Sequence, residues 1–466
     1  MSLIQLANTD PVNQPKALWK QGNLVEVAIE DLSDTGDGVG RWQERVIFVP
    51  DTVPGDRAIV KLIHTKPKFA IASLSELIVP SPHRIRPSCI VADKCGGCQW
   101  QHIDYAYQLE AKRNQVVQAL CRIGGFENPP VDPVLAAPSA LAYRNKATYP
   151  LGISASNQVQ AGYYQQGSHH IINLNQCPVQ DSRLNPFLKE IKQDIQTQGW
   201  QIYDEKRHQG QIRHLALRIG RRTGEILLTL VVKDWRLDNI AHQAEEWLQR
   251  YGQLVGVCLN RNSDRTNTIF GKETRCIAGK AYLTEEFAGL TFQVRPDTFF
   301  QVNTEVAETL LQTIRQHLNL QGNETLLDAY CGIGTLTLPL AQHVKSAIGL
   351  ELQREAVIQA QRNAQQNHIN NVTFQTGAVE KLLPNLEIVP DIVLLDPPRK
   401  GCDRIVIDTL LQSLPPRIVY VSCKVATLAR DLKLLCQSHY RLTRIQPADF
   451  FPQTAHIECA AFLTKD

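Results

Sequence analysis

The spacing of apolar residues changes along the chain. From Glu324 onward, short apolar runs alternate with helical stretches of about a dozen residues, the pattern of βαβ units in a parallel sheet. The clearest runs are the one that begins at Thr325 and those at Ala347–Glu351, Ile392–Leu395 and Arg417–Val421. This part of the chain is therefore predicted to have an α/β, Rossmann-like fold.

The N-terminal part has a different pattern. Between Gly22 and Val79, short apolar runs alternate with turn residues, and strands at this spacing predict a small β-barrel. Three prolines, Pro80, Pro82 and Pro87, mark the end of this barrel.

The middle of the chain predicts a β-rich domain. Strands are expected at Leu215–Ile219 and Ile226–Val232, and a helix near Ile240–Arg250. An earlier helix is expected from about Tyr105 to Arg122, ending at a pair of glycines. We therefore predict four parts: a leader at 1–15, the barrel at 16–79, a central domain at 80–290 and the α/β domain at 291–466. The helix at 105–122 is expected to pack on the last of these.

Composition limits the class of protein. The chain has 466 residues, 43% of them hydrophobic and 20% charged, as expected for a protein with more than one packed core. No apolar run approaches the roughly 20 residues that cross a bilayer, and Met1–Gln5 does not resemble a signal peptide. We expect a cytoplasmic protein without a membrane partner, so its 12 cysteines are not expected to form disulfides.

Basic residues gather in two segments, although the net charge is only +3. Residues 60–122 carry more Lys and Arg than Asp and Glu, and Lys206–Arg222 contains no acidic residue. Such segments either contact a phosphate backbone or form an ordinary solvated surface, and the sequence leaves both interpretations open.

A glycine-rich turn indicates a cofactor site. Residues 325–335 read as a strand that runs into Gly332 and Gly334, and a helix at 336–343 follows. About 20 residues further on, Glu351 ends a second strand, where a carboxylate suits ribose hydroxyls. The turn lacks both the three-glycine dinucleotide pattern and a phosphate-binding lysine, so S-adenosylmethionine fits it best. The alternative is an acid that caps a purely structural turn.

A candidate nucleophile lies at the end of another apolar run. Cys423 follows Arg417–Val421 after one residue, Ser422, and Asp396 follows Ile392–Leu395 directly. In a parallel sheet both turns lie at the edge where ligands bind. A candidate base, Glu458, lies in a strand-like segment near the C-terminus. Otherwise Cys423 is a small core residue, as most intracellular cysteines are.

Four motifs carry a family resemblance. Phe299–Asn303, Asp396–Gly401, Val421–Cys423 and Pro452–Glu458 together resemble the RNA uracil-C5 methyltransferases, which modify tRNA and 23S rRNA. Residues 16–79 resemble the TRAM domain, a small RNA-binding barrel. The resemblance implies a methyltransferase fold, an RNA substrate and S-adenosylmethionine as methyl donor.

The same resemblance implies roles for individual residues. Cys423 would add to C6 of the uracil, and Glu458 would remove the C5 proton. S-adenosylmethionine would be bound by Gln301, Tyr330, Glu351 and Asp396. The flipped base would be bound by Phe299, Gln301 and Asp396.

Three further positions qualify this picture. His456, two residues from Glu458, would face the same side of a strand and orient the base, or it is a packing residue. The chain has Lys424–Val425 where many members have Asn-Pro, and Thr335 where many have Asn. Lys424 beside the thiol is expected to lower the pKa of Cys423.

Four cysteines form a candidate metal site. Cys89, Cys95 and Cys98 lie close together in the sequence, and Cys177 is distant. Four thiolates hold zinc or an iron–sulfur cluster, and a redox pair is a third interpretation. The spacing resembles the [4Fe-4S] site of the rRNA enzymes of the family. The remaining cysteines are expected to be structural: Cys121, Cys258, Cys276, Cys331, Cys402, Cys436 and Cys459.

Several functions compete at this point. A non-enzymatic RNA-binding or Fe–S sensor protein is disfavoured because Cys423, Glu458 and Asp396 are all present. An amino-group methyltransferase would need an aromatic residue where Arg399 stands. We expect 23S rRNA as the favoured partner and tRNA as the alternative, with no obligate protein partner evident.

Overall fold

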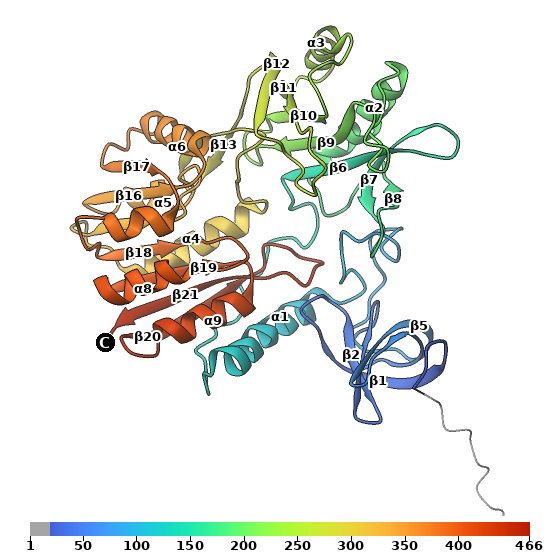
Figure 1. Ribbon diagram of the computed structural model, residues 1–466, viewed down its shortest axis with the longest axis horizontal. Coiled ribbons are helices and arrows are strands. Elements are labelled where there is room, and N and C mark those ends of the chain that lie inside the picture. The colour runs from blue at the N-terminus through green and yellow to red at the C-terminus, as the bar shows by residue number, and fades with distance from the viewer. Residues whose placement is uncertain (1–18) are drawn as a thin grey trace, which may run out of the picture. The chain divides into compact units, whose positions relative to one another are not determined.

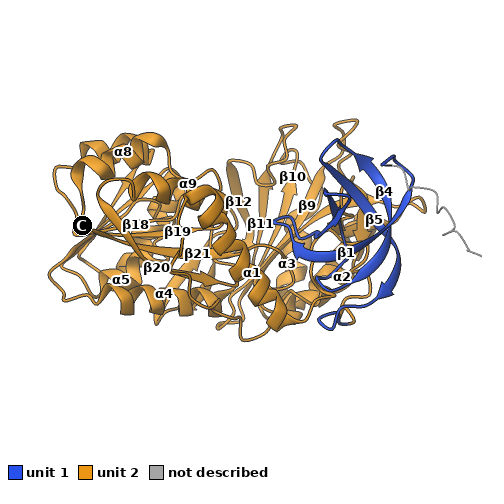
Figure 2. Ribbon diagram, turned by 90° about the horizontal axis from the view of Figure 1, so that it is seen from below, with its two compact units in different colours: residues 1–85 blue, residues 86–466 orange. Residues whose placement is uncertain are grey.

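The computed structural model describes residues 19–466, so the leader predicted at 1–15 lies outside the described residues. Figure 1 shows the elements along the chain. The chain forms two compact units, residues 1–85 and 86–466, coloured separately in Figure 2.

The first unit contains the barrel that the sequence predicts. Its strands form a closed barrel in the order β1-β2-β3-β5-β4, in which β3 and β5 are parallel. Alternate residues of β1, such as Val25 and Val27, point into the barrel core, and the residues between them are exposed. The strands are β1 Leu24–Leu32, β2 Gly38–Trp42, β3 Arg45–Val49, β4 Arg57–Thr65 and β5 Phe69–Val79.

The second unit begins with the central sheet, a seven-stranded sheet in the order β12-β11-β10-β9-β6-β7-β8. Helices α2 and α3 pack their apolar sides on one face of this sheet and form a single core with it. The elements are β6 Lys146–Ile153, β7 Val159–Tyr164, β8 Ile171–Asn173, α2 Asn185–Thr197, β9 Ile212–Ile219, β10 Ile226–Val232, α3 Ile240–Arg250, β11 Leu254–Arg261 and β12 Glu273–Gly279.

A second seven-stranded sheet follows, in the order β17-β16-β15-β18-β19-β21-β20. The ladders joining β15 through β19 are parallel, as predicted, and β21 is antiparallel to β19. Its strands are β15 Thr325–Asp328, β16 Ser346–Glu351, β17 Val372–Thr376, β18 Ile392–Leu395, β19 Arg417–Ser422, β20 Tyr440–Ala448 and β21 Glu458–Lys465. A two-stranded sheet of β13 Leu283–Phe287 and β14 Leu290–Val294 lies between the two large sheets in sequence.

Helices cover both faces of the second sheet, as Figure 1 shows. Residues of α4, α5 and α6 share one core with the sheet, and residues of α7, α8 and α9 share the other. Helix α1 joins the second core through Val116, together with Leu120 just beyond the helix. The helices are α1 Tyr105–Ala119, α4 Thr304–Leu318, α5 Thr337–Ala341, α6 Arg354–Gln366, α7 Val379–Leu382, α8 Arg404–Ser413 and α9 Val425–Leu435.

Some boundaries differ from the predicted ones. Helix α1 ends in a π-helical turn at Leu120–Gly124, which Gly125 closes with a φ of 77°. Helix α5 is shorter than the predicted helix at 336–343 because the glycine turn continues to Leu336. Strand β9 begins three residues earlier than predicted, at Ile212. Within residues 19–466, no helix combines the length and apolar character that a membrane span requires.

Candidate functional site

The order and direction of the strands bring five polar residues to one edge of the second sheet. Asp328 and Glu351 end β15 and β16, Asp396 follows β18, and Cys423 follows β19. Glu458 starts β21, which runs in the opposite direction. The carboxyl ends of β15, β16, β18 and β19 therefore meet the amino end of β21 at this edge.

The ladder between β19 and β21 sets the position of the candidate nucleophile. Val421 pairs with Ala460 and Ser422 pairs with Cys459. One step beyond the last pair, Cys423 faces Glu458 across the two strands. The structure thus brings together the candidate nucleophile and the candidate base, which lie far apart in the sequence.

The electrostatics of this edge are dominated by burial and by like charges. Burial raises the pKa of the Cys423 thiol, and the carboxylates of Glu458 and Asp396 raise it further. Burial and Asp396 hold the pKa of Glu458, only 8% exposed, well above its usual value. Burial, with a smaller effect of Asp328, raises the pKa of Asp396 to about 7. These groups favour protons over charge until a cation or a substrate compensates them.

The expected effect of Lys424 on the thiol is wrong. The pKa of Cys423 is raised, and the nearby cation that opposes this shift is Arg399. Arg399 follows the Asp-Pro-Pro turn and its side chain is exposed. The reason is burial, since the thiol loses more hydration than nearby cations restore.

The turn after Cys423 is intact despite Lys424–Val425. The Ser422 hydroxyl accepts a hydrogen bond from the Lys424 backbone N at 3.2 Å and donates one to the Lys424 carbonyl at 3.2 Å. Helix α9 begins directly afterwards, at Val425. A serine hydroxyl therefore closes the turn without a proline at this position.

The glycine turn and Glu351 lie against each other. The Gly332 backbone N donates to Glu351 Oε2 at 3.1 Å, and the Gln353 N donates to Glu351 Oε1 at 2.7 Å. Gly332 and Gly334 have φ angles of 54° and 86°, which favour glycine. The turn therefore presents backbone and a carboxylate, with no side chain at either glycine.

Two more residues of this turn have identifiable partners. Asp328 is 2% exposed and accepts a hydrogen bond from the Thr337 hydroxyl at 2.6 Å. Burial raises the pKa of Asp328 to about 6. Tyr330 is partly buried and interacts with the Cys402 thiol, while Thr335 is 9% exposed. No role was predicted for Asp328, although its place at a strand end is the same signal that indicated Glu351.

The segment Phe299–Asn303 begins with two adjacent aromatic residues that differ in exposure to solvent. Phe300 is 3% exposed and packs against Phe287 and Phe292, whereas Phe299 is 67% exposed. The Asn145 side chain holds the segment by donating to the Gln301 carbonyl at 2.9 Å and to the Thr304 hydroxyl at 3.1 Å. Phe299 is thus the aromatic residue available to a ligand.

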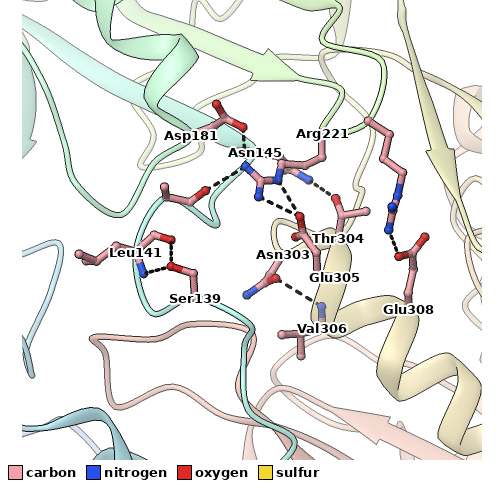
Figure 3. Close-up of polar contacts among 12 residues, drawn as sticks. Ser139, Leu141, Asn145, Asp181, Arg221, Asn303, Thr304, Glu305, Val306 and Glu308 are labelled. Atoms are coloured by element: carbon pink, nitrogen blue, oxygen red, sulfur yellow. Dashed lines mark hydrogen bonds and ion pairs between the residues drawn. The ribbon is translucent and has the colours of Figure 1, made fainter.

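Figure 3 shows the polar contacts around the start of α4. Asn303 caps this helix by accepting a hydrogen bond from the Val306 N. Arg221 forms ion pairs with Asp181 at 2.5 Å and with Glu305 at 2.8 Å. Asn145 and Arg221 belong to the central domain and were not singled out by the sequence, because nothing local to them indicates these long-range contacts.

His456 does not lie on a strand. It precedes β21, and its ring is exposed and packs edge-on against Phe451, with ring centroids 5.9 Å apart. The expectation that it faces the same side of a strand as Glu458 is therefore wrong, because the strand begins only at Glu458. The loop before Glu458 is instead anchored by a buried ion pair, Lys112–Asp449, at 2.6 Å.

The four cysteines of the candidate metal site line one cavity of about 160 Å³. Burial raises the pKa of the Cys98 thiol to about 12, and the charges of Cys177, Cys95 and Cys89 add to the shift. Within the described part of the chain, no three His, Cys, Asp or Glu side chains are arranged as a metal-binding group. The four thiols therefore surround one space without coming together as the ligands of a single metal ion.

Comparisons with known proteins cover nearly the whole chain. A family model described as tRNA (Uracil-5-)-methyltransferase matches residues 104–466, and a TRAM domain model matches residues 18–75. The chain is 75% identical to an RNA methyltransferase of Nostoc sp. over 96% of this chain and 98% of the relative. It is 55% identical to one of Synechocystis sp. over 96% of each chain.

One solved structure is similar over almost the full length. It is the Pyrococcus abyssi tRNA (uracil-54, C5)-methyltransferase in complex with S-adenosyl-L-homocysteine. The TM-score is 0.76 at 27% identity, covering 94% of this chain and 100% of that one.

Proposed function

We propose that this protein methylates C5 of a specific uridine in RNA. The chain belongs to the tRNA (uracil-5-)-methyltransferase family and is therefore an RNA methyltransferase. The observation that carries the proposal is the position of Cys423 opposite Glu458, at the edge where β15, β16 and β18 also end. A thiol beside a buried carboxyl is the pair that this chemistry needs.

Cys423 is the proposed nucleophile. Its thiolate adds to C6 of the uracil, forming a carbon–sulfur bond and moving the electron pair of the C5–C6 double bond toward C5 and the O4 carbonyl. Because burial and two carboxylates raise the pKa of this thiol, Arg399 is the residue that assists ionisation. Addition of the thiolate makes C5 nucleophilic, whereas C5 of an unmodified uracil is a poor nucleophile.

Glu458 is the proposed general base. After C5 has been alkylated, its remaining proton goes to Glu458, and the electron pair of that C–H bond restores the double bond as Cys423 leaves. Glu458 accepts this proton as a carboxylate, the form that the charge of Arg399 favours, and its raised pKa makes that carboxylate a stronger base.

S-adenosylmethionine is the proposed methyl donor, and when bound it supplies an electrophilic methyl group on a sulfonium. The residues at the edge fit it. Glu351 suits the ribose hydroxyls, and the open glycine turn admits a ligand close to the backbone. Gln301, Tyr330 and Asp396 complete the proposed set.

The uridine would be held by residues around Phe299. As an exposed aromatic ring, Phe299 is proposed to stack on the flipped base, with Gln301 and Asp396 bonding its polar edge. Because the pKa of Asp396 is raised to about 7, a protonated Asp396 can donate to the O4 carbonyl, as well as accept when ionised.

The four-cysteine cavity is proposed to hold a [4Fe-4S] cluster. Soft thiolates suit iron–sulfur chemistry, and Cys89, Cys95, Cys98 and Cys177 share one space. No step of the reaction uses the cluster. Anaerobically purified protein should contain iron and sulfide, and Cys89→Ser should lose both. Protein that binds zinc alone would refute this part.

Two RNA substrates are distinguished by one experiment. The cysteine spacing resembles that of the rRNA enzymes of the family and favours 23S rRNA, whereas the similar solved structure is that of a tRNA (uracil-54, C5)-methyltransferase. Both substrates agree with a cytoplasmic location. In a strain lacking the gene, nucleoside mass spectrometry with site mapping should show 5-methyluridine missing from one position in 23S rRNA. Loss from tRNA alone would select the alternative, and unchanged 5-methyluridine in both would refute the proposed function.

A further inference from the structure

The central sheet packs one face on α2 and α3. On its other face, the register pairs Lys146 of β6 directly with Arg218 of β9, and His214 with Pro150 four residues along the same strands. Leu227, which pairs with Arg218 in the next strand, belongs to the core that α4, α5 and α6 share. Two cationic side chains thus stand side by side at the border of that core.

Arg218 is buried, and no carboxylate in residues 19–466 forms an ion pair with it. It is 5% exposed, and its Nη2 donates to the Thr298 carbonyl at 3.1 Å. Its Nε and Nη1 are buried and have no hydrogen-bond partner among the described residues. Burial lowers its pKa to about 10. A guanidinium in this state is costly unless an anion completes it.

Lys146 is in a similar state. Its Nζ lies 4.8 Å from the centre of the Phe270 ring, and no carboxylate among the described residues forms an ion pair with it. Burial first, and then the charges of Arg218 and Arg144, lower its pKa well below the usual value. Two acids act on the pair, and both have other partners. Asp297 is paired with Arg295 at 3.3 Å, and Glu285 accepts hydrogen bonds from the backbone N of Arg221 and Arg222.

Most other arginines of the basic segment 206–222 have more polar partners than Arg218. Arg221 and Arg222 are paired with Glu305 and Glu308, and Arg213 donates to backbone carbonyls. Among the described residues of that segment, Arg213 keeps one buried nitrogen without a partner, Nε, and Arg218 keeps two, Nε and Nη1. Arg213 is held by backbone carbonyls through its other nitrogens, so Arg218 is the buried arginine with the fewest contacts.

The location connects the pair to the site. Arg218 contacts the carbonyl of Thr298, the residue before Phe299. Asn145, next to Lys146 in the chain, holds the Gln301 carbonyl. Phe299 and Gln301 are the residues proposed to contact the target base. An anion bound by the two cations would lie beside that base.

We propose that Lys146 and Arg218 bind an RNA phosphate that flanks the target nucleotide. The inference rests on the proposed function for the identity of the neighbouring base. It assigns the two buried cations a positioning role, in which the phosphate fixes the strand while Phe299 receives the base.

RNA binding as a function of salt tests the proposal. Unmodified RNA from a strain lacking the gene is titrated by filter binding against wild type, Lys146→Met and the control Lys189→Met. Lys189 lies exposed on α2, on the opposite side of the same sheet. Lys189→Met therefore removes the same charge as Lys146→Met at a position away from the proposed phosphate site. Lys146→Met should weaken binding roughly tenfold. It should also reduce the slope of log K against log salt by about 0.7–0.9, the value for one lost phosphate contact.

Thermal stability separates binding from a structural role. Because the Lys146 Nζ makes no hydrogen bond among the described residues, Lys146→Met should leave Tm unchanged or raise it while RNA affinity falls. Arg218→Met should also weaken RNA binding. Lower Tm with an unchanged salt slope, or equal slopes in Lys146→Met and Lys189→Met, would overturn the proposal. Methyl transfer is measured separately, so a protein that binds RNA with the expected slopes but transfers no methyl group would refute only the proposed function.

Discussion

Replacing Lys112 by methionine should cause a large loss of stability. Lys112 and Asp449 are each 0% exposed in their side chains, and Lys112 Nζ lies 2.6 Å from Asp449 Oδ1. Lys112 also donates to the Phe451 carbonyl at 3.1 Å. Without Lys112, Asp449 Oδ1 still accepts a hydrogen bond from the Phe451 backbone N at 3.2 Å. Asp449 Oδ2 has no hydrogen-bond partner among the described residues. Leaving a buried charge uncompensated costs about 3–5 kcal/mol, against about 1 kcal/mol for a lost neutral hydrogen bond.

Urea unfolding measures this difference. Lys112→Met should lower the free energy of unfolding by about 3–5 kcal/mol with an unchanged m value. Adding Asp449→Asn should restore most of the loss, because the unpaired charge is then gone. The control, Lys433→Met on the exposed side of α9, should change stability by less than about 0.5 kcal/mol. A loss of about 1 kcal/mol in Lys112→Met, or no recovery in the double variant, would refute the reasoning.

Three further predictions concern the thiols and the base. Because the pKa of Cys423 is raised, its thiolate fraction grows as pH rises, so adduct formation with RNA should accelerate toward alkaline pH. Arg399→Gln removes the cation that opposes this shift and should move the rate–pH profile to higher pH; an unmoved profile would contradict it. Glu458→Gln should still form the covalent adduct but release it slowly, so the RNA–protein complex should accumulate on denaturing gels; failure to accumulate would count against the base. Cys276 is exposed, and its contact with the buried Cys258 lowers its pKa, so iodoacetamide should label it well before Cys258 by peptide mass spectrometry; equal labelling would be the contrary result.

The sequence was most informative where a feature repeats along the chain. Alternating runs indicated the parallel sheet and the barrel, and the ends of those runs indicated Glu351, Asp396 and Cys423. These predictions rest on local patterns that one strand or turn determines by itself.

Long-range contacts could not be predicted from the sequence. Asn145 and Gln301 are separated by 156 positions, and Lys112 and Asp449 by 337, so no local pattern indicates either contact. The pKa of Cys423 was expected to fall because Lys424 is adjacent in sequence. It rises because burial depends on the whole fold. His456 was assigned to a strand because the segment resembles one, but β21 begins only at Glu458.

Mapping the covalent adduct tests the central claim, that Cys423 attacks the uracil of an RNA. RNA containing 5-fluorouridine is incubated with the protein and S-adenosylmethionine, because fluorine at C5 prevents release of the adduct. Trypsin cuts after Arg417 and Lys424, so the peptide Ile418–Lys424 contains Cys423 as its single cysteine. The nucleotide should be found on this peptide, and Cys423→Ala should give no adduct. An adduct on another peptide, or none with the wild-type protein, would contradict the account.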